Sequence, residues 1–105
     1  MSVVVRVSIQ RCKPENFTQL CDMMMAALAR LEPGLGKLPG LMHFYAGADQ
    51  AASSLTNVSI WTSLENAKQL DTYQPMLDLG REFVAKGAVF ERPVMNYETL
   101  WELPQ

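Results

Sequence analysis

The chain has 105 residues, a hydrophobic fraction of 49% and a formal net charge of −2, which is an ordinary globular composition with room for one domain. No run of Lys or Arg occurs, and nucleic acid is not an expected partner because it requires clustered basic residues. No apolar stretch is long enough to cross a bilayer, and the apolar run at the N-terminus is too short for a signal peptide. We therefore expect one cytoplasmic domain over residues 1–105, without membrane contact.

The sequence offers few residues for redox or metal chemistry. Its two cysteines, Cys12 and Cys21, do not form a Cys-x-x-Cys pair, and His43 is the single histidine. This excludes a Cys/His zinc site of the usual kind. We interpret Cys21 as a small core residue and Cys12 as a thiol at the edge of a loop.

A strand and a long helix are predicted in the first third of the chain. Residues 3–10 are rich in β-branched side chains, which favour a strand. Pro14 suits the first turn of a helix, where a backbone N–H is not needed. Apolar residues then recur at steps of three and four, as on one face of a helix: Phe17, Leu20, Cys21, Met24, Leu28 and Leu31. Pro33 and Gly34 are expected to end this helix.

Two strands follow, over residues 41–46 and 55–62, joined by an irregular loop over residues 47–54. Ser63 is expected to cap the next helix, because its hydroxyl can accept a free N–H of the first turn.

The last part of the chain predicts a broken helix and a final strand. Helical segments are expected over residues 64–71 and 76–86, with a break at Pro75 and an end at Gly87. A strand is expected over residues 94–101. The order of elements is then that of an α+β, ferredoxin-like β-α-β-β-α-β fold, with the helices on one face of the sheet.

Alternation along the strands gives the predicted sheet two different faces. One face is almost purely apolar: Val3, Val5, Val7, Phe44, Val58 and Ile60. The other mixes apolar and polar side chains: Arg6, His43, Tyr45, Asn57, Ser59 and Trp61. An apolar face must be covered, so we expect it to meet the same face of a second copy in a homodimer. Buried polar groups need hydrogen-bond partners, which a small-molecule pocket between the mixed face and the helices would supply.

The third predicted strand carries a recognisable pattern. It ends in Trp61, followed by Thr-Ser-Leu-Glu-Asn-Ala, and Asn57 precedes Trp61 by four residues on the same face. In these residues, and in length and element order, the chain resembles the antibiotic biosynthesis monooxygenase (ABM) domain family of the dimeric α+β barrel superfamily. The resemblance implies two sheets packed into a barrel at a dimer interface, and one pocket per subunit. It also implies that a small aromatic, phenolic or quinol-like substrate loses a proton and reacts directly with dioxygen, with no cofactor.

The resemblance also suggests roles for individual residues. It implies that Asn57 and Trp61 donate hydrogen bonds to the substrate or a peroxy intermediate, and that the charge of Arg81 favours the substrate anion. His43 is the only imidazole available as a base near neutral pH, and Tyr73 is a further donor. The other expected substrate contacts on the mixed face are Arg6, Tyr45 and Ser59.

One departure from the family pattern is the missing histidine in the segment 67–74. It argues against a haem-degrading relative, which needs a helical histidine as an iron ligand, and it weighs against ordinary quinol oxidation.

Each of these residues also has a plainer interpretation. Trp61 can be a packing residue, Asn57 can satisfy nearby backbone groups, and His43 can be hydrogen-bonded in the core. Arg81 can be a surface residue paired with an acidic neighbour on its helix. Two other functions therefore stay open: a non-catalytic small-molecule binding or stress-related protein on this scaffold, and a structural dimer without a ligand. A cavity lined by His43, Asn57 and Trp61 would exclude the last of these.

Overall fold

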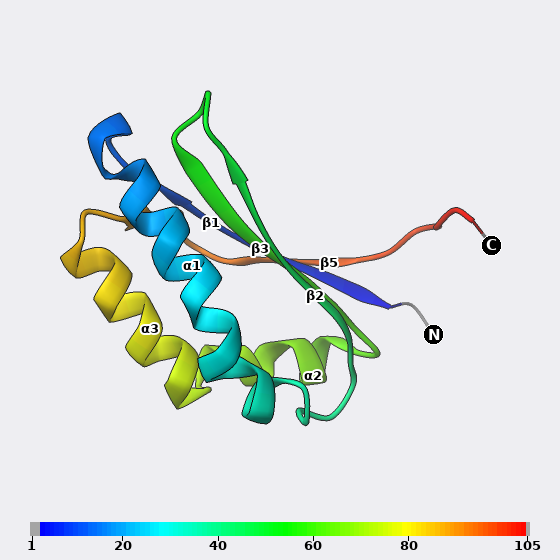
Figure 1. The fold of residues 1–105 in the computed structure, drawn as a ribbon. Coiled ribbons are helices and arrows are strands. Elements are labelled where there is room, and N and C mark those ends of the chain that lie inside the picture. Colours follow the sequence, from blue (N-terminus) through cyan, green and yellow to red (C-terminus); the bar gives the residue numbers. More distant parts are fainter. Residues whose placement is uncertain (1–2, 105) are drawn as a thin grey trace.

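In the computed structural model, which describes residues 3–104, the helices cover one face of a five-stranded antiparallel sheet (Figure 1). The strands are β1 (Val4–Arg11), β2 (Leu41–Asp49), β3 (Ser54–Trp61), β4 (Val89–Phe90) and β5 (Met95–Glu98). The helices are α1 (Pro14–Leu35), α2 (Leu64–Ala67), the 3-10 helix η1 (Lys68–Asp71) and α3 (Gln74–Ala85). The predicted α+β class and order of elements are confirmed.

Strand β1 is central in the sheet. Its whole length pairs with β3, from Val4 opposite Trp61 to Arg11 opposite Ser54. On its other side, the first half of β1 pairs with β5 and the end pairs with β4, while β2 lies outside β3 at the edge. The expected last strand over residues 94–101 is shorter than predicted, and β4 was missed because two residues are too few to show an alternating pattern.

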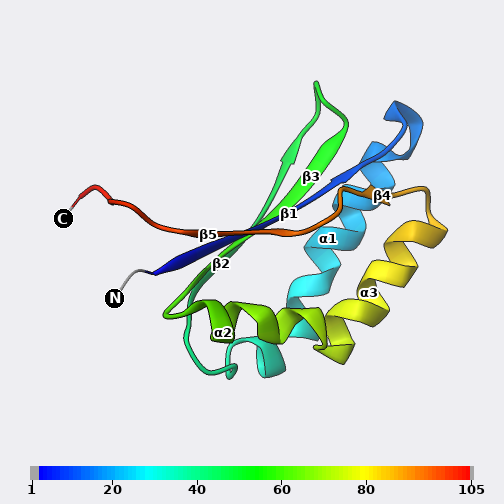
Figure 2. The ribbon, with the colours of Figure 1, turned by 180° about the vertical axis from the view of Figure 1, so that it is seen from behind.

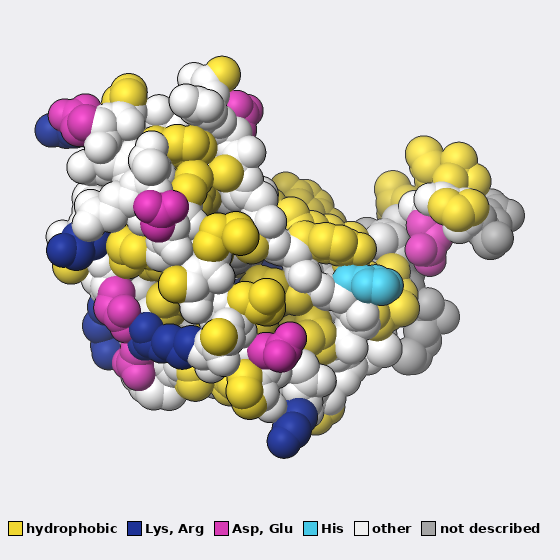
Figure 3. Space-filling model, in the orientation of Figure 1, with side chains coloured by type: hydrophobic (Ala, Val, Ile, Leu, Met, Phe, Trp, Pro, Cys, Tyr) yellow, Lys and Arg dark blue, Asp and Glu magenta, His cyan; other side chains and the backbone are white. Residues whose placement is uncertain are grey.

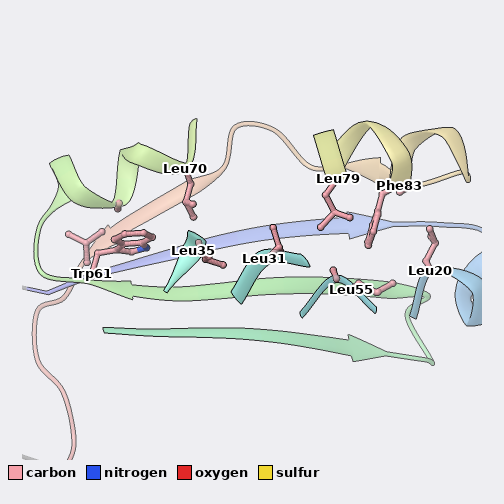
Figure 4. Packing of buried hydrophobic residues seen from close by; sticks show 12 residues of the cluster. Leu20, Leu31, Leu35, Leu55, Trp61, Leu70, Leu79 and Phe83 are labelled. Carbon is pink, nitrogen blue, oxygen red and sulfur yellow. The ribbon is translucent and has the colours of Figure 1, made fainter. Parts of the chain in front are cut away.

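The hydrophobic core lies between the sheet and the helices (Figure 4). Leu79 and Phe83 of α3 point toward the strands, and Trp61 lies at one end of the sheet beneath α2. The side chains of α1 that are buried are Leu20, Ala27, Leu31 and Leu35. The predicted inward stripe of α1 is therefore only partly correct, because Leu28 is 65% exposed.

Proline has different effects at the two helices. Pro33 does not end α1 at once, because α1 continues for two further residues, to Leu35; the bond and the close packing that a proline disrupts lie with the preceding turn, and little helix follows it. The predicted break between the two helical segments is present, but it falls at residues 72–73, and Pro75 lies in the first turn of α3, where proline is readily accommodated. Ser63 caps α2 as predicted, since its hydroxyl accepts from the N–H of Asn66 at 3.1 Å.

The predicted faces are correct for β1 and β3 but wrong for β2. Leu41 lies opposite Trp61, yet His43 lies opposite Ile60, so Met42 is an extra residue at a β-bulge. One extra residue moves every later side chain to the other face. Phe44 therefore faces the helices, whereas His43 and Tyr45 face away from them. The expected loop over residues 47–54 is also wrong at its start, because β2 continues to Asp49.

None of the described helices lies on the second face of the sheet (Figure 2). Its side chains are apolar and half-buried along β1 and β3: Val5, Val7, Ile9, Val58 and Ile60. Beyond β5, the C-terminal segment runs away from the helices (Figure 1) and carries Trp101, which is 76% exposed. Among residues 3–104, no helix is both long enough and apolar enough to cross a membrane.

Candidate functional site

A cavity of about 800 Å³ lies between the sheet and α3. Its size is within the range of small-molecule sites, roughly 300–1,000 Å³. The sheet supplies most of its polar lining, from the side chains that alternation turns toward the helices: Arg6, Ser8, Gln10, Asn57, Ser59 and Asn96. Apolar side chains form much of the remaining wall, including Phe44, Leu70, Leu79 and Phe83. The cavity therefore combines largely apolar walls with a few polar groups that converge from one sheet face.

Arg6 is the charged residue that is buried in this cavity, with 6% of its surface exposed. One guanidinium nitrogen donates to Asp71 Oδ1 at 2.7 Å, and the other donates to Asn96 Oδ1 at 3.2 Å. Asn96 lies directly opposite Arg6 in the β1–β5 ladder. Because a guanidinium has five N–H donors in a fixed plane, these two contacts hold it in place and leave other donors for a ligand.

Two amide side chains that line the cavity have an oxygen with no hydrogen-bond partner within residues 3–104. These oxygens are Oε1 of Gln10 and Oδ1 of Asn57, and both atoms are buried. A buried acceptor without a partner costs about 1–3 kcal/mol. Rotation of either amide toward the cavity would let a ligand hydroxyl on the helix side of β1 and β3 satisfy its oxygen, so this pair favours a ligand with phenolic or other O–H groups.

Trp61 does not line the cavity. It is 0% exposed, and its indole N–H donates to Ser59 Oγ at 2.8 Å. This position matches the plainer interpretation of Trp61 as a packing residue. Ser59 does line the cavity, and its hydroxyl, having accepted the indole N–H, keeps a proton that it can donate. Trp61 therefore orients Ser59 rather than reaching a ligand itself.

Three other predicted site residues lie away from the cavity. The rings of His43 and Tyr45 stack with centroids 5.9 Å apart on the open face of the sheet, as a result of the bulge at Met42. Tyr73 lies against α1, where its hydroxyl occupies the space beside Gly34 that a side chain would fill.

Arg81 borders the cavity but is largely exposed, and it pairs with Asp78 at 3.1 Å. The cavity thus brings together four of the eight predicted residues: Arg6, Asn57, Ser59 and Arg81. Sequence reasoning missed Gln10, Asp71 and Asn96 as site residues. Gln10 had a usable signal, since it follows Arg6 at an even spacing on the same strand face.

A second space of about 510 Å³ lies between α1 and the edge strand β2, and it is almost entirely apolar. Ala46 and Ala48 form its strand side, and Met25 and Leu28 of α1 form part of its helix side. Hydrophobic side chains gather over the middle of this side of the molecule (Figure 3). Cys21 also lines this apolar groove, and burial raises the pKa of its thiol, which favours the unreactive protonated form.

Within the described part of the chain, no three His, Cys, Asp or Glu side chains gather as a metal-binding group would. The polar groups of the cavity are instead hydrogen-bond donors, hydrogen-bond acceptors and cations. Such an arrangement can bind, orient and stabilise an organic anion.

No known protein-family model matches the sequence, and no curated protein matches it. Solved structures do resemble it. SnoaB from Streptomyces nogalater, a cofactor-independent oxygenase, has a TM-score of 0.64 and 17% identity, with all of both chains covered. A candidate antibiotic biosynthesis monooxygenase from Deinococcus radiodurans has a TM-score of 0.74 and 9% identity, covering 97% of each chain. Another from Nitrosomonas europaea has a TM-score of 0.69 and 14% identity, covering 95% of this chain and 92% of its own. The chain therefore has the fold of these ABM-type structures, as its sequence predicted.

Proposed function

We propose that this protein is a cofactor-independent monooxygenase of the ABM type, acting in the cytoplasm on a small aromatic, phenolic or quinol-like substrate. The observation that carries the proposal is a cavity of small-molecule size on the helix side of the sheet, lined by the fixed guanidinium of Arg6 and by the amide side chains of Gln10 and Asn57, whose oxygens have no partner in residues 3–104. The shared fold with SnoaB, itself a cofactor-independent oxygenase, supports the same class of reaction.

The chemistry requires a substrate that supplies all the electrons. A hydroquinone and one O₂ give a hydroxyquinone and one water: one oxygen atom forms the new C–O bond, and the other leaves as water with two of the substrate's hydrogens. The protein's task is to hold the substrate and stabilise the anion formed when a hydroxyl loses its proton. Arg6 supplies the buried positive charge, and Asn57 fixes the orientation of the ring. Among the described lining residues, Asp71 is the one carboxylate available to accept the proton.

A non-catalytic binding protein would use the same cavity, so binding and turnover must be measured separately. We expect dioxygen uptake with members of a panel of substituted hydroquinones, with one atom of ¹⁸O₂ in the product. We expect the Asn57→Ala variant to bind the best of these substrates at least tenfold more weakly without oxygen, because a hydroxyl then loses its buried acceptor.

Asn66→Ala is the matched control, since Asn66 bonds to Thr62 outside the cavity and should leave uptake unchanged. If no hydroquinone is oxidised and Asn57→Ala leaves binding intact, the oxygenase proposal is wrong. If ligands bind through Asn57 but none is oxidised, the protein is a binding protein.

We further propose that the protein is a homodimer joined through the open face of the sheet. This face combines half-buried apolar side chains on β1 and β3 with the exposed rings of Tyr45 and Tyr97. A contiguous apolar surface of this kind marks a protein–protein interface in water-soluble proteins. The C-terminal segment, with its exposed Leu100 and Trp101, extends where it could contact the second copy.

Val7→Glu is expected to give a monomer in sedimentation velocity, because it places a charge at the centre of the open face, opposite Val58 on β3 and Met95 on β5. Met25→Glu is the control, since Met25 is exposed on α1, on the helix side of the molecule, and this variant should stay dimeric. A wild-type protein that sediments as a monomer, or a dimer that survives Val7→Glu, would contradict this interface.

A further inference from the structure

The cavity and the apolar groove adjoin each other beneath α1. Four residues line both spaces: Met24, Phe44, Asn57 and Leu79. Asn57 is among them, so this polar side chain stands where the polar cavity and the apolar groove share a wall. A ligand that spans this shared wall would place a polar end toward Arg6 and an apolar end between α1 and β2.

The two spaces differ sharply in charge. The cavity is bordered by four cations, Arg6, Lys68, Arg81 and Arg92, and by one carboxylate, Asp71. Asp71 pairs with Arg6, and Asp78 pairs with Arg81 from outside, which leaves an excess of positive charge in a chain whose net charge is −2. A ligand that carries a fixed negative charge would be attracted to this rim. The groove, by contrast, has a single charged residue in its lining, Glu32.

We propose that the substrate is an amphipathic aromatic acid: a hydroxylated ring bearing a carboxylate, extended by an apolar chain. The ring lies in the cavity with its carboxylate toward the unpaired cations that border it, Lys68 or Arg92, and the chain lies in the groove between α1 and β2. This inference rests on the proposed function for the site, and it adds the charge and the chain that the substrate should carry. The groove alone matches the size of a ligand pocket, so a bare monocyclic phenol would leave it empty.

Binding measured without oxygen tests this proposal independently of turnover. We would titrate the protein anaerobically, by calorimetry, with 2,5-dihydroxybenzoate and with its derivatives bearing propyl, pentyl and heptyl chains. We expect Kd to fall about three- to fourfold for each added methylene, as burial of a methylene predicts. The matching hydroquinones without the carboxylate should bind at least tenfold more weakly. Equal affinities along the chain series, or no preference for the acid, would overturn the proposal.

A variant that fills the groove should abolish the effect of chain length. Ala46 lines the groove from the edge strand, so Ala46→Phe should weaken the heptyl ligand at least tenfold and leave the parent dihydroxybenzoate unchanged. Ala51→Phe, in the exposed turn after β2, is the control and should change neither. If Ala46→Phe does not fold, Leu28→Gln is the substitute, because it makes the groove lining more polar. Leu28 is already 65% exposed, so the fold should tolerate this change. Tight heptyl binding in both groove variants would place the chain elsewhere.

The carboxylate contact has its own test. A Lys68→Gln/Arg92→Gln double variant should lose most of the preference for the acid over the matching hydroquinone, whereas Lys37→Gln, a change on an exposed residue outside both spaces, should keep it. An unchanged preference in the double variant would overturn the assigned orientation. Tight binding of the chain-bearing acids without dioxygen uptake would support this inference while rejecting the oxygenase proposal, so the two failures are distinguishable.

Discussion

Replacing Trp61 by alanine is expected to lower the free energy of unfolding by about 3–5 kcal/mol, the usual cost of removing a large buried aromatic side chain. Trp61 is 0% exposed and lies in the core at one end of the sheet, near α2 (Figure 4). Its loss opens a cavity and leaves Ser59 without the indole donor. Urea denaturation followed by far-UV circular dichroism measures the change, and Trp101 remains as an exposed fluorophore that reports little on the core.

The Trp61→Phe variant separates packing from chemistry. It keeps an aromatic ring in the core but removes the N–H that Ser59 accepts at 2.8 Å. We expect kcat/KM for the best hydroquinone to fall less than tenfold, because Ser59 loses its orientation and not its hydroxyl. A fall of a hundredfold or more, the size seen when a donor to a developing anion is removed, would contradict the structure and restore Trp61 as a catalytic donor. If Trp61 acts only through Ser59, the Trp61→Phe/Ser59→Ala double variant should have the same kcat/KM as Ser59→Ala alone. Additive losses in kcat/KM would show that the two residues act independently.

Most of the fold could be predicted because its longer elements each have a local cause. β-branched residues mark β1, the spacing of apolar residues marks α1, and Ser63 marks the start of α2. These signals are short-range and appear directly in the sequence. The errors at Pro33 and Pro75 have the same origin, since a proline near a helix end can belong to the helix, and the sequence does not say which side of the boundary it occupies.

The site was only half predictable, because it depends on register. Arg6 and Asn57 were placed correctly, as alternation along regular strands was enough. His43 was placed wrongly, because the single bulge at Met42 turns β2 over, and a bulge leaves no mark in the pattern of polar and apolar residues. Asp71 was missed for another reason: it reaches Arg6 from η1 across 65 residues of sequence, a contact that only the packed fold creates.

The position of His43 also changes what can act as the base. A histidine on the open face cannot take a proton from a substrate bound on the helix side. The proton acceptor is then Asp71 or solvent water, and Arg6 stabilises the substrate anion. In the proposed reaction, stabilisation of the substrate anion by a buried cation lowers the barrier most. We therefore expect the rate to depend on Arg6 more than on any other described residue of the cavity.

Replacing Arg6 by methionine is expected to lower kcat/KM for hydroquinone oxidation by about 100-fold or more, the size of effect seen when a preorganised group at a developing anion is lost. Methionine keeps an unbranched apolar side chain in the buried position and removes the positive charge. We expect the free energy of unfolding to change by only about 1 kcal/mol. The partner, Asp71, has a side chain that is 53% exposed, so it regains water when the pair is broken, whereas breaking a fully buried pair would cost about 3–5 kcal/mol. Steady-state oxygen uptake and urea denaturation on the same preparation measure the two effects.

Arg11→Met is the matched control for this prediction. Arg11 lies on the same strand, but its side chain is 55% exposed and its ion pair with Glu91 lies at the surface, so we expect both activity and stability to stay near wild type. Arg6→Lys should fall between wild type and Arg6→Met, because an ammonium keeps the charge but cannot reach Asp71 and Asn96 in one plane. If Arg6→Met loses several kcal/mol of stability and its activity falls only as the folded fraction falls, Arg6 is a structural ion-pair residue. The anion would then have to be stabilised by the cations at the rim of the cavity.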